Sequence, residues 1–312
     1  MNKEIRVVTN ATVSNVACGF DTMGFSINKP ADELVLRIVP EPGVKIVKIT
    51  GDDGRLPAEV LNNTAGRALL SMVEKLGLNI GLEAEIHKKM PFGSGLGSSA
   101  ASAVAAVFAL DRLLELNLSR EELLLYAIDG EVVASKSVHA DNVAPALYGG
   151  FTLIRGYNPP DVVEIDVPDD LYCTVLHPDI EINTAESRAL LPREIPLSDA
   201  ITQWGNTAGL IAGLLKRDYA LIGRSLKDVV AEPVRSYLIP GFSQIKEAAM
   251  DYGALGCSIS GSGPAIFALS SHMGTASIVG EMMYHALIMT GLSGDIFVSK
   301  INKEGPKVLY LK

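Results

Sequence analysis

The sequence feature best suited to chemistry is a glycine-rich loop, which reads Pro91-Phe92-Gly93-Ser94-Gly95-Leu96-Gly97-Ser98-Ser99-Ala100-Ala101. Glycine allows a backbone to approach a ligand closely and to adopt conformations that side chains forbid. The helix expected after the loop begins with unpaired amide groups and the positive end of its dipole, and both suit phosphate. The hydroxyl groups of Ser98 and Ser99 suit a helix cap, a phosphate or Mg²⁺. The loop therefore predicts a phosphate site, although a glycine-rich turn with an ordinary serine cap contains the same residues.

Other common phosphate-binding motifs do not fit this loop. The sequence has no Gly-Lys-Ser/Thr triplet, and its glycine spacing differs from the dinucleotide-binding fingerprint. A second glycine-rich segment, Ser260-Gly261-Ser262-Gly263-Pro264-Ala265, is consistent either with a hairpin turn or with a further ligand loop. The glycines alone leave these alternatives open.

Together the two glycine-rich segments resemble a known family. The run from Pro91 to Ala101 resembles the phosphate loop of the GHMP kinases, which include galactokinase and the homoserine, mevalonate and phosphomevalonate kinases. The resemblance implies that this loop wraps the phosphates of ATP, and that Gly261 and Gly263 belong to a C-terminal motif that lies against it. It also implies a two-domain α+β fold, with a ribosomal-S5-domain-2-like N-terminal domain and a ferredoxin-like C-terminal domain.

Two further segments are similar to the homoserine kinases within this family. One is His139-Ala140-Asp141-Asn142-Val143-Ala144-Pro145, followed by Gly149-Gly150-Phe151, which is similar almost residue for residue. The other runs from Ala11 to Gly24 and resembles the substrate motif, with Ala17-Cys18-Gly19-Phe20-Asp21 where the usual pattern is Gly-Pro-Gly-Phe-Asp. The change spares Asn15 and Asp21, so it affects the detail of the loop more than the expected function.

The resemblance also implies a metal site and a mechanism. Glu131 takes the position of the Mg²⁺ ligand and Ser99 that of its hydroxyl partner, whereas an isolated helical glutamate is more often a solvated surface group. The general base of mevalonate kinases corresponds here to Asn142, and an amide cannot act as a base. The implied mechanism is in-line attack by the substrate hydroxyl on the γ-phosphate, accelerated by positioning and charge neutralisation. Asp141 is the alternative base. It is ranked lower because adjacent residues of a helix point about 100° apart, so its side chain would point away from that of Asn142.

Homoserine carries an ammonium group, a carboxylate and a primary hydroxyl, and the resemblance implies a partner for each. Asp21 and Asn15 suit the ammonium group as an anion and a neutral acceptor. Arg188 and Arg235 suit the carboxylate, because a guanidinium group pairs with it through two hydrogen bonds. The side chains expected near the reacting hydroxyl are His139, Asn142 and Thr184.

Hydrophobic periodicity predicts the helices that position these residues. A helix is expected over 64–76. The resemblance implies that Asn63 contacts adenine, and Asn62 is the second choice for this role. A cap on the helix is an equal alternative role for Asn63. A second helix should run from the glycine-rich loop to about residue 114, and a third over 120–139 should carry Glu131.

The best candidate linker is the segment 156–161, because its two consecutive prolines, Pro159 and Pro160, fit neither a helix nor a central strand. The predicted domains are therefore residues 1–158 and 159–312. Strands and helices follow one another without regular βαβ alternation, which favours the α+β class.

Composition excludes several kinds of partner. The 312-residue chain has a net charge of −9 and no Lys/Arg-rich block, so nucleic acid and anionic membranes are poor partners. Its three cysteines are far apart and odd in number, which favours separate buried thiols. The N-terminus lacks a signal-peptide pattern, and the most apolar stretch is too short to cross a bilayer. We expect a cytoplasmic protein; a homodimer is typical of the family, although no interface is evident.

The sequence thus predicts an ATP- and Mg²⁺-dependent enzyme that resembles those converting L-homoserine to O-phospho-L-homoserine in threonine biosynthesis. A kinase of the same family for another small alcohol is the alternative. Mevalonate-type substrates have no ammonium group, so the set of two arginines and one aspartate argues against them. A catalytically silent binding protein would be expected to lose Glu131, the loop serines or the glycines, and all are present.

Overall fold

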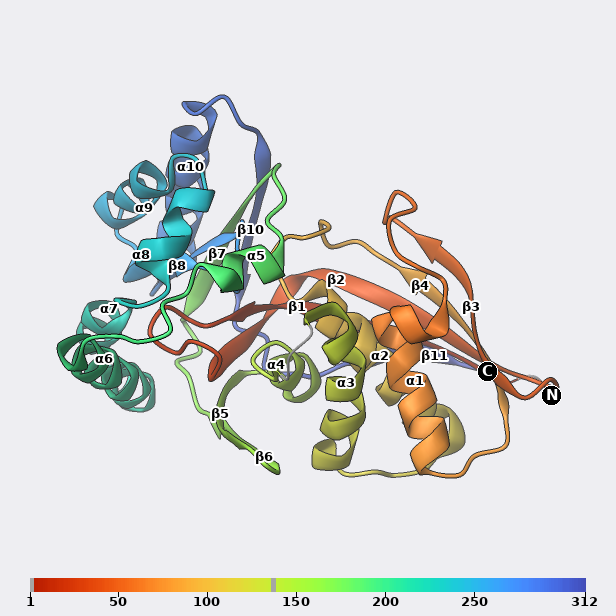
Figure 1. Ribbon diagram of the computed structural model, residues 1–312. Coiled ribbons are helices and arrows are strands. Elements are labelled where there is room, and N and C mark those ends of the chain that lie inside the picture. The colour runs from red at the N-terminus through yellow and green to blue at the C-terminus, as the bar shows by residue number, and fades with distance from the viewer. Residues whose placement is uncertain (1–2, 136–138) are drawn as a thin grey trace.

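The computed structural model describes residues 3–135 and 139–312, and it places the strands of these residues in two sheets that are covered by helices (Figure 1). The larger sheet has the strand order β11-β1-β2-β4-β3, with β5 paired to β2 and β6 paired to β5. Its strands are β1 (Glu4–Ser14), β2 (Met23–Val39), β3 (Gly43–Thr50), β4 (Gly81–His87), β5 (Phe151–Tyr157), β6 (Pro160–Ile165) and β11 (Lys307–Leu311).

Helices rich in small residues cover this sheet. They are α1 (Thr64–Lys75), α2 (Ser98–Leu114), α3 (Arg120–Ser135) and α4 (Val143–Tyr148), with a 3₁₀ turn, η1 (Val60–Asn62), before α1. Most of α2 is buried, and its alanines let α1, α3 and the strands approach it closely. The loop that precedes α2 is thereby fixed at the end of a buried helix.

The smaller sheet is antiparallel, with the order β10-β7-β9-β8. Its strands are β7 (Tyr172–Pro178), β8 (Gly256–Ile259), β9 (Ile266–Ser270) and β10 (Gly294–Lys300). The helices of this half are α5 (Thr184–Ala189), α6 (Leu197–Lys216), α7 (Tyr219–Ser225), α8 (Glu232–Arg235), α9 (Phe242–Asp251) and α10 (Met273–Ile288), with η2 (Ser236–Leu238). In Figure 1, α9 and α10 lie on one side of this sheet, away from the larger one.

The strand pairing crosses the predicted domain boundary. Residues 156–161 form the tip of the β5–β6 hairpin, with the turn at residues 158–159, so the larger sheet extends to Ile165. The last strand, β11, returns to pair with β1, which brings the two ends of the chain together. The division into 1–158 and 159–312 stays a prediction, with its boundary inside a hairpin.

Two predicted helix ends were wrong. The helix expected over 120–139 is described only as α3, which ends at Ser135; residues 136–138 lie outside the described part of the chain, and His139 is not helical. Hydrophobic periodicity also predicts a helix over 219–230, of which α7 keeps only the part up to Ser225. The α+β class is confirmed. No helix in the described ranges combines the length and apolarity needed to cross a bilayer.

Candidate active site

Residues from both halves of the chain line one cavity of about 800 Å³. Most of the predicted site residues line it, namely Asn15, Asp21, Asn63, Phe92, Gly93, Ser94, Gly95, Gly97, Ser98, Ser99, Glu131, His139, Asn142, Thr184, Arg188, Arg235 and Gly261. The others are Pro91, Leu96, Ala100, Ala101 and Gly263, which are absent from the lining. Leu96, Ala100 and Ala101 are fully buried, so their side chains pack in the core.

The glycine-rich loop follows a left-handed backbone path at each of its three glycines. The φ angle is +61° at Gly93, +74° at Gly95 and +68° at Gly97. A Cβ atom on Gly97 would lie 2.0 Å from Thr12 Oγ1 and 2.7 Å from Asn142 Oδ1. Both the backbone angle and the available space therefore require glycine at this position.

The first turn of α2 has no side-chain cap. Gly97 occupies the N-cap position and α2 begins at Ser98, so the alternative of an ordinary serine cap is wrong. The serine hydroxyls donate elsewhere: Ser98 Oγ to Asp32 Oδ2 at 2.8 Å and Ser99 Oγ to Glu131 Oε1 at 2.7 Å. Amides at an uncapped helix start suit an anionic ligand such as phosphate.

The second glycine-rich segment lies against this loop, as the sequence predicts. Ser260 Oγ donates to the carbonyl oxygen of Gly95 at 2.7 Å, and the amide of Ala265 donates to that of Ser94 at 3.1 Å. Gly261 also donates from its amide to the carbonyl oxygen of Ser14 at 3.2 Å. The segment thus connects the phosphate loop to the end of β1.

Glu131 and Ser99 form a hydroxyl–carboxylate pair at the wall of the cavity. Burial of the carboxyl group raises the pKa of Glu131 to about 7, opposed by the hydrogen bond from Ser99. A solvated surface carboxylate, the alternative for Glu131, is therefore wrong. An oxygen-rich pair of this kind has the ligand types that Mg²⁺ prefers.

Lys88 and Asp32 are residues near the phosphate loop that the sequence analysis missed. They form a buried ion pair, and Lys88 Nζ also donates at 2.8 Å to both the carbonyl oxygen of Ser98 and Ser102 Oγ. Lys88 and Ser102 line the cavity. The sequence did offer a signal for Lys88, because this lysine lies shortly before the loop that starts at Pro91. The contact with Asp32, on the neighbouring strand, has no local signal.

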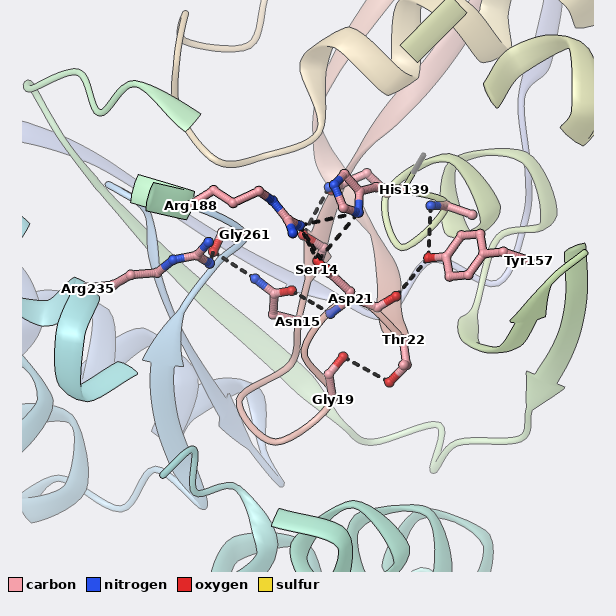
Figure 2. Close-up of polar contacts among 12 residues, drawn as sticks. Ser14, Asn15, Gly19, Asp21, Thr22, His139, Tyr157, Arg188, Arg235 and Gly261 are labelled. Carbon is pink, nitrogen blue, oxygen red and sulfur yellow. Dashed lines mark hydrogen bonds and ion pairs between the residues drawn. The ribbon is translucent and has the colours of Figure 1, made fainter. Parts of the chain in front are cut away.

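The opposite end of the cavity holds a cluster of charges (Figure 2). Arg188 Nη2 lies 2.8 Å from both carboxylate oxygens of Asp21. The ring nitrogen Nδ1 of His139 is 3.4 Å from Arg188 Nη2 and 3.6 Å from Asp21 Oδ1. Burial lowers the pKa of His139. His139 was predicted near the substrate hydroxyl, and the structure places it beside these charged groups.

Phe20 brings the two predicted arginines together. Its ring centroid is 5.5 Å from the guanidinium carbon of Arg188 and 5.1 Å from that of Arg235. Arg235 is 4% exposed, and its Nη1 donates to the carbonyl oxygen of Gly261 at 3.0 Å. Its Nε has no hydrogen-bond partner among the described residues. Burial and the nearby Arg188 lower the pKa of Arg235, so an anion here is favoured.

Asn142 lies between the two ends of the cavity. It accepts a hydrogen bond from Thr12 Oγ1 at 2.8 Å and donates one to Ser14 Oγ at 2.9 Å. Asp141 precedes it in a turn before α4, so the helical argument for its direction was wrong. Asp141 lines the cavity, and burial, with the nearby Asp21, raises its pKa to about 7.

Asn63 and Thr184 lie at two helix starts. The Asn63 side chain caps α1, accepting from the amides of Ala65 at 3.1 Å and Gly66 at 3.2 Å. The cap alternative is therefore correct, and a role with adenine stays a prediction for this cavity-lining residue. Thr184 begins α5, and its hydroxyl lies 3.2 Å from Ser262 Oγ.

Comparison with known proteins gives matches along the whole chain. Residues 63–150 match the model of the GHMP kinase N-terminal domain, and residues 210–287 match that of the GHMP kinase C-terminal domain. The homoserine kinase of Chlorobium phaeobacteroides strain BS1 is 49% identical, covering 98% of this chain and 100% of that protein. The homoserine kinase of Chlorobaculum tepidum is 47% identical, covering 98% of each.

Solved structures agree with the sequence matches. The crystal structure of homoserine kinase from Cytophaga hutchinsonii has a TM-score of 0.96 at 52% identity, covering 98% of this chain and 97% of that one. The structure of L. major mevalonate kinase, at 20% identity and a TM-score of 0.72 over 96% of each chain, shares the fold. The chain therefore belongs to the homoserine kinases of the GHMP kinase family, whose two-domain α+β fold it has.

Proposed function

We propose that the protein transfers the γ-phosphate of ATP to the hydroxyl of L-homoserine, giving O-phospho-L-homoserine and ADP for threonine biosynthesis. The observation that carries the proposal is the arrangement of one cavity, with a phosphate loop at one end and paired charges at the other. A zwitterionic amino acid needs both an anion and cations, and Asp21, Arg188 and Arg235 supply them.

The two ends are suited to holding the reactants in line. Asn142 contacts Thr12 and Ser14 at the end of β1 and approaches Gly97 of the phosphate loop. An amide at this junction can orient a hydroxyl, although it cannot remove its proton as a base. We infer direct attack by the hydroxyl, in which positioning supplies most of the acceleration, as a loose phosphoryl-transfer transition state allows.

Mg²⁺ fits the pair formed by Ser99 and Glu131. The fit rests on a buried carboxylate beside a hydroxyl at the uncapped start of α2. When bound, Mg²⁺ supplies neutralisation of charge on the phosphates. Among the described residues that line this end of the cavity, Lys88 supplies a positive charge, and its ammonium group lies beside Ser98. We place the activity in the cytoplasm as a prediction, consistent with three free cysteines.

Release of ADP with MgATP and L-homoserine tests the proposal. A panel of D-homoserine, L-serine, mevalonate, galactose and shikimate runs beside it. Selective turnover of L-homoserine is expected. Turnover of another alcohol, with none of L-homoserine, would support a kinase activity but contradict the assignment of L-homoserine as the substrate.

Asp141 provides the test of the mechanism, because it is the acidic residue next to Asn142. Without a general base, Asp141→Asn keeps kcat within about tenfold of the parent, since only local packing and charge change. Loss of about 10² to 10⁴ in kcat, with loss of the ascending limb of its pH profile, would assign Asp141 as the base.

A further inference from the structure

A second group of metal-binding side chains lies outside the cavity, on the smaller sheet. His177 is near the end of β7, Asp179 is two residues further along the chain, and Asp295 of β10 lies opposite His177 in the strand register. Registered partners share a face of the sheet, so His177 and Asp295 lie on the same side, and Asp179 follows directly after the end of β7. One ligand atom of each residue lies within 4.8 Å of the other two.

The observation that points to a ligand is the state of His177. Its side chain is 5% exposed, and neither ring nitrogen has a hydrogen-bond partner within residues 3–135 and 139–312. Buried polar groups are almost always paired, because losing hydration without a replacement destabilises the fold. An imidazole ring nitrogen is a common ligand for transition-metal ions.

We propose that His177, Asp179 and Asp295 bind one divalent transition-metal ion, with water completing its coordination. One imidazole nitrogen and two carboxylate oxygens suit Zn²⁺, whereas Mg²⁺ and Ca²⁺ prefer oxygen ligands alone. Bonds of about 2.0 to 2.2 Å to one ion keep its ligands within about 4.4 Å of one another. Small rotations of the two exposed carboxylates bring the three ligand atoms into that range.

Asp179 is already oriented for this role. Ser293 Oγ donates a hydrogen bond to Asp179 Oδ2, and the amide of Asp179 donates to the carbonyl oxygen of Ser293 at 2.8 Å. Such supporting contacts fix the direction of metal-binding carboxylates. The ion would join β10 to the start of the connection between β7 and α5, the helix that carries Arg188. It would therefore stabilise the support of the substrate end and is separate from Glu131 on α3.

Titration of the metal-free protein with ZnCl₂, without nucleotide or Mg²⁺, tests the site by calorimetry and by thermal unfolding. One Zn²⁺ per chain is expected, with a rise in Tm. Asp295→Asn changes an exposed side chain and should weaken binding at least about tenfold while leaving the metal-free Tm unchanged. His177→Gln should do the same to binding. Two matched controls keep the parental affinity, His285→Asn at an exposed histidine and Glu131→Gln at the other carboxylate site.

The outcomes separate this site from other sources of zinc affinity. Loss of binding in Asp295→Asn and His177→Gln alone supports the proposal. Equal affinity in Asp295→Asn, loss of affinity in either control, or the absence of saturable binding overturns it. The kinase activity of Asp295→Asn with MgATP in zinc-free buffer should equal that of the parent, because Asp295 does not line the cavity.

Discussion

Two loops meet beside Asn142, and both use left-handed backbone in different ways. In the phosphate loop, positive φ angles occur at glycines, whose lack of a side chain leaves room for Thr12 and Asn142. In the substrate loop, residues 14–21, positive φ angles between +43° and +67° occur at residues with side chains, namely Asn15, Val16, Ala17 and Asp21. The glycines of the phosphate loop adopt this backbone conformation without strain, whereas the backbone of the substrate loop is strained.

The difference follows from the ligands that each loop is expected to hold. Backbone amides suffice for a phosphate, so the loop before α2 needs no side chains at its glycine positions. An ammonium group requires an anion, so glycine cannot replace Asp21. The strained loop is fixed by its surroundings: Asn15 Nδ2 donates to the carbonyl oxygen of Gly261 at 2.8 Å, and Tyr157 Oη donates to that of Asp21 at 2.8 Å. Local strain persists at functional sites when neighbours hold it in this way.

Glu131→Ala gives the largest expected effect, because it removes the carboxylate proposed to hold Mg²⁺ beside the phosphate loop. We expect kcat to fall about a thousandfold, consistent with the several kcal/mol that a metal ion contributes to such reactions. Steady-state ADP release measures the loss, and an unchanged far-UV circular dichroism spectrum shows that the fold is intact. Near-normal turnover would contradict the metal assignment and leave the phosphate end to backbone amides and Lys88.

Gly97→Ala tests whether the phosphate loop depends on the absence of a side chain. The new methyl group would approach Thr12 and Asn142 and would sit on left-handed backbone, so we expect a loss of about 2 to 4 kcal/mol in unfolding free energy. Gly77→Ala is the matched control, since Gly77 has φ +63° and no atom within 4 Å of the added carbon. It should lose about 1 kcal/mol. Equal losses in urea unfolding would show that space at Gly97 is unimportant.

Arg188→Lys tests the substrate end by replacing a planar guanidinium with a point charge. We expect KM for L-homoserine to rise about tenfold, since a two-bonded pairing with the substrate carboxylate is lost, and KM for ATP to stay unchanged. Arg193→Lys, at an exposed arginine, is the control and should change neither constant. A parallel rise in KM for ATP would show that the two ends of the cavity are not separable.

Each end of the cavity also holds a buried carboxyl group with its pKa raised to about 7, Glu131 at the phosphate end and Asp141 at the substrate end. A raised pKa in the folded state gives stability that is present below the unfolded value and is lost as pH rises through about 7. Without Mg²⁺ or nucleotide, the midpoint urea concentration of unfolding should therefore decrease as the pH is raised from about 5 to about 8. Glu131→Gln and Asp141→Asn should each make the fall shallower. If the midpoint depends on pH in both variants as it does in the parent, the decrease must come from other titratable groups.

Local patterns predicted the phosphate end better than the substrate end. The glycine spacing and the alanine-rich helix are contiguous, so the sequence shows both. The contact between Asp21 and Arg188 joins residues 167 positions apart, and no spacing rule brings them together. Only the resemblance to known kinases placed them in one site. Phe20 was part of the same motif, yet its place between two arginines required the fold.

Prolines explain two elements that the sequence analysis missed. Pro160 begins β6, which pairs with β5 alone in the larger sheet, and an edge strand tolerates the missing amide hydrogen. Pro145 lies in the first turn of α4, where its amide has no helical partner to lose. Pro160 was interpreted from the sequence as a break in the chain, and Pro145 was not used as a signal for the start of a helix. The turn that carries Asp141 was missed with α4.

Ala17→Gly is the smallest expected effect and the sharpest test of strain in the substrate loop. Ala17 has φ +57°, and its position is the one where the usual homoserine kinase pattern has glycine. Relief of left-handed strain, worth about 1 to 2 kcal/mol, is partly offset by the greater freedom of glycine in the unfolded chain, so we expect a gain of up to about 1 kcal/mol. Thermal unfolding measures it, with KM for L-homoserine unchanged because Asn15 and Asp21 keep their side chains. A clear loss of stability would mean that the Ala17 methyl group, which is buried, contributes more by packing than its backbone loses by strain.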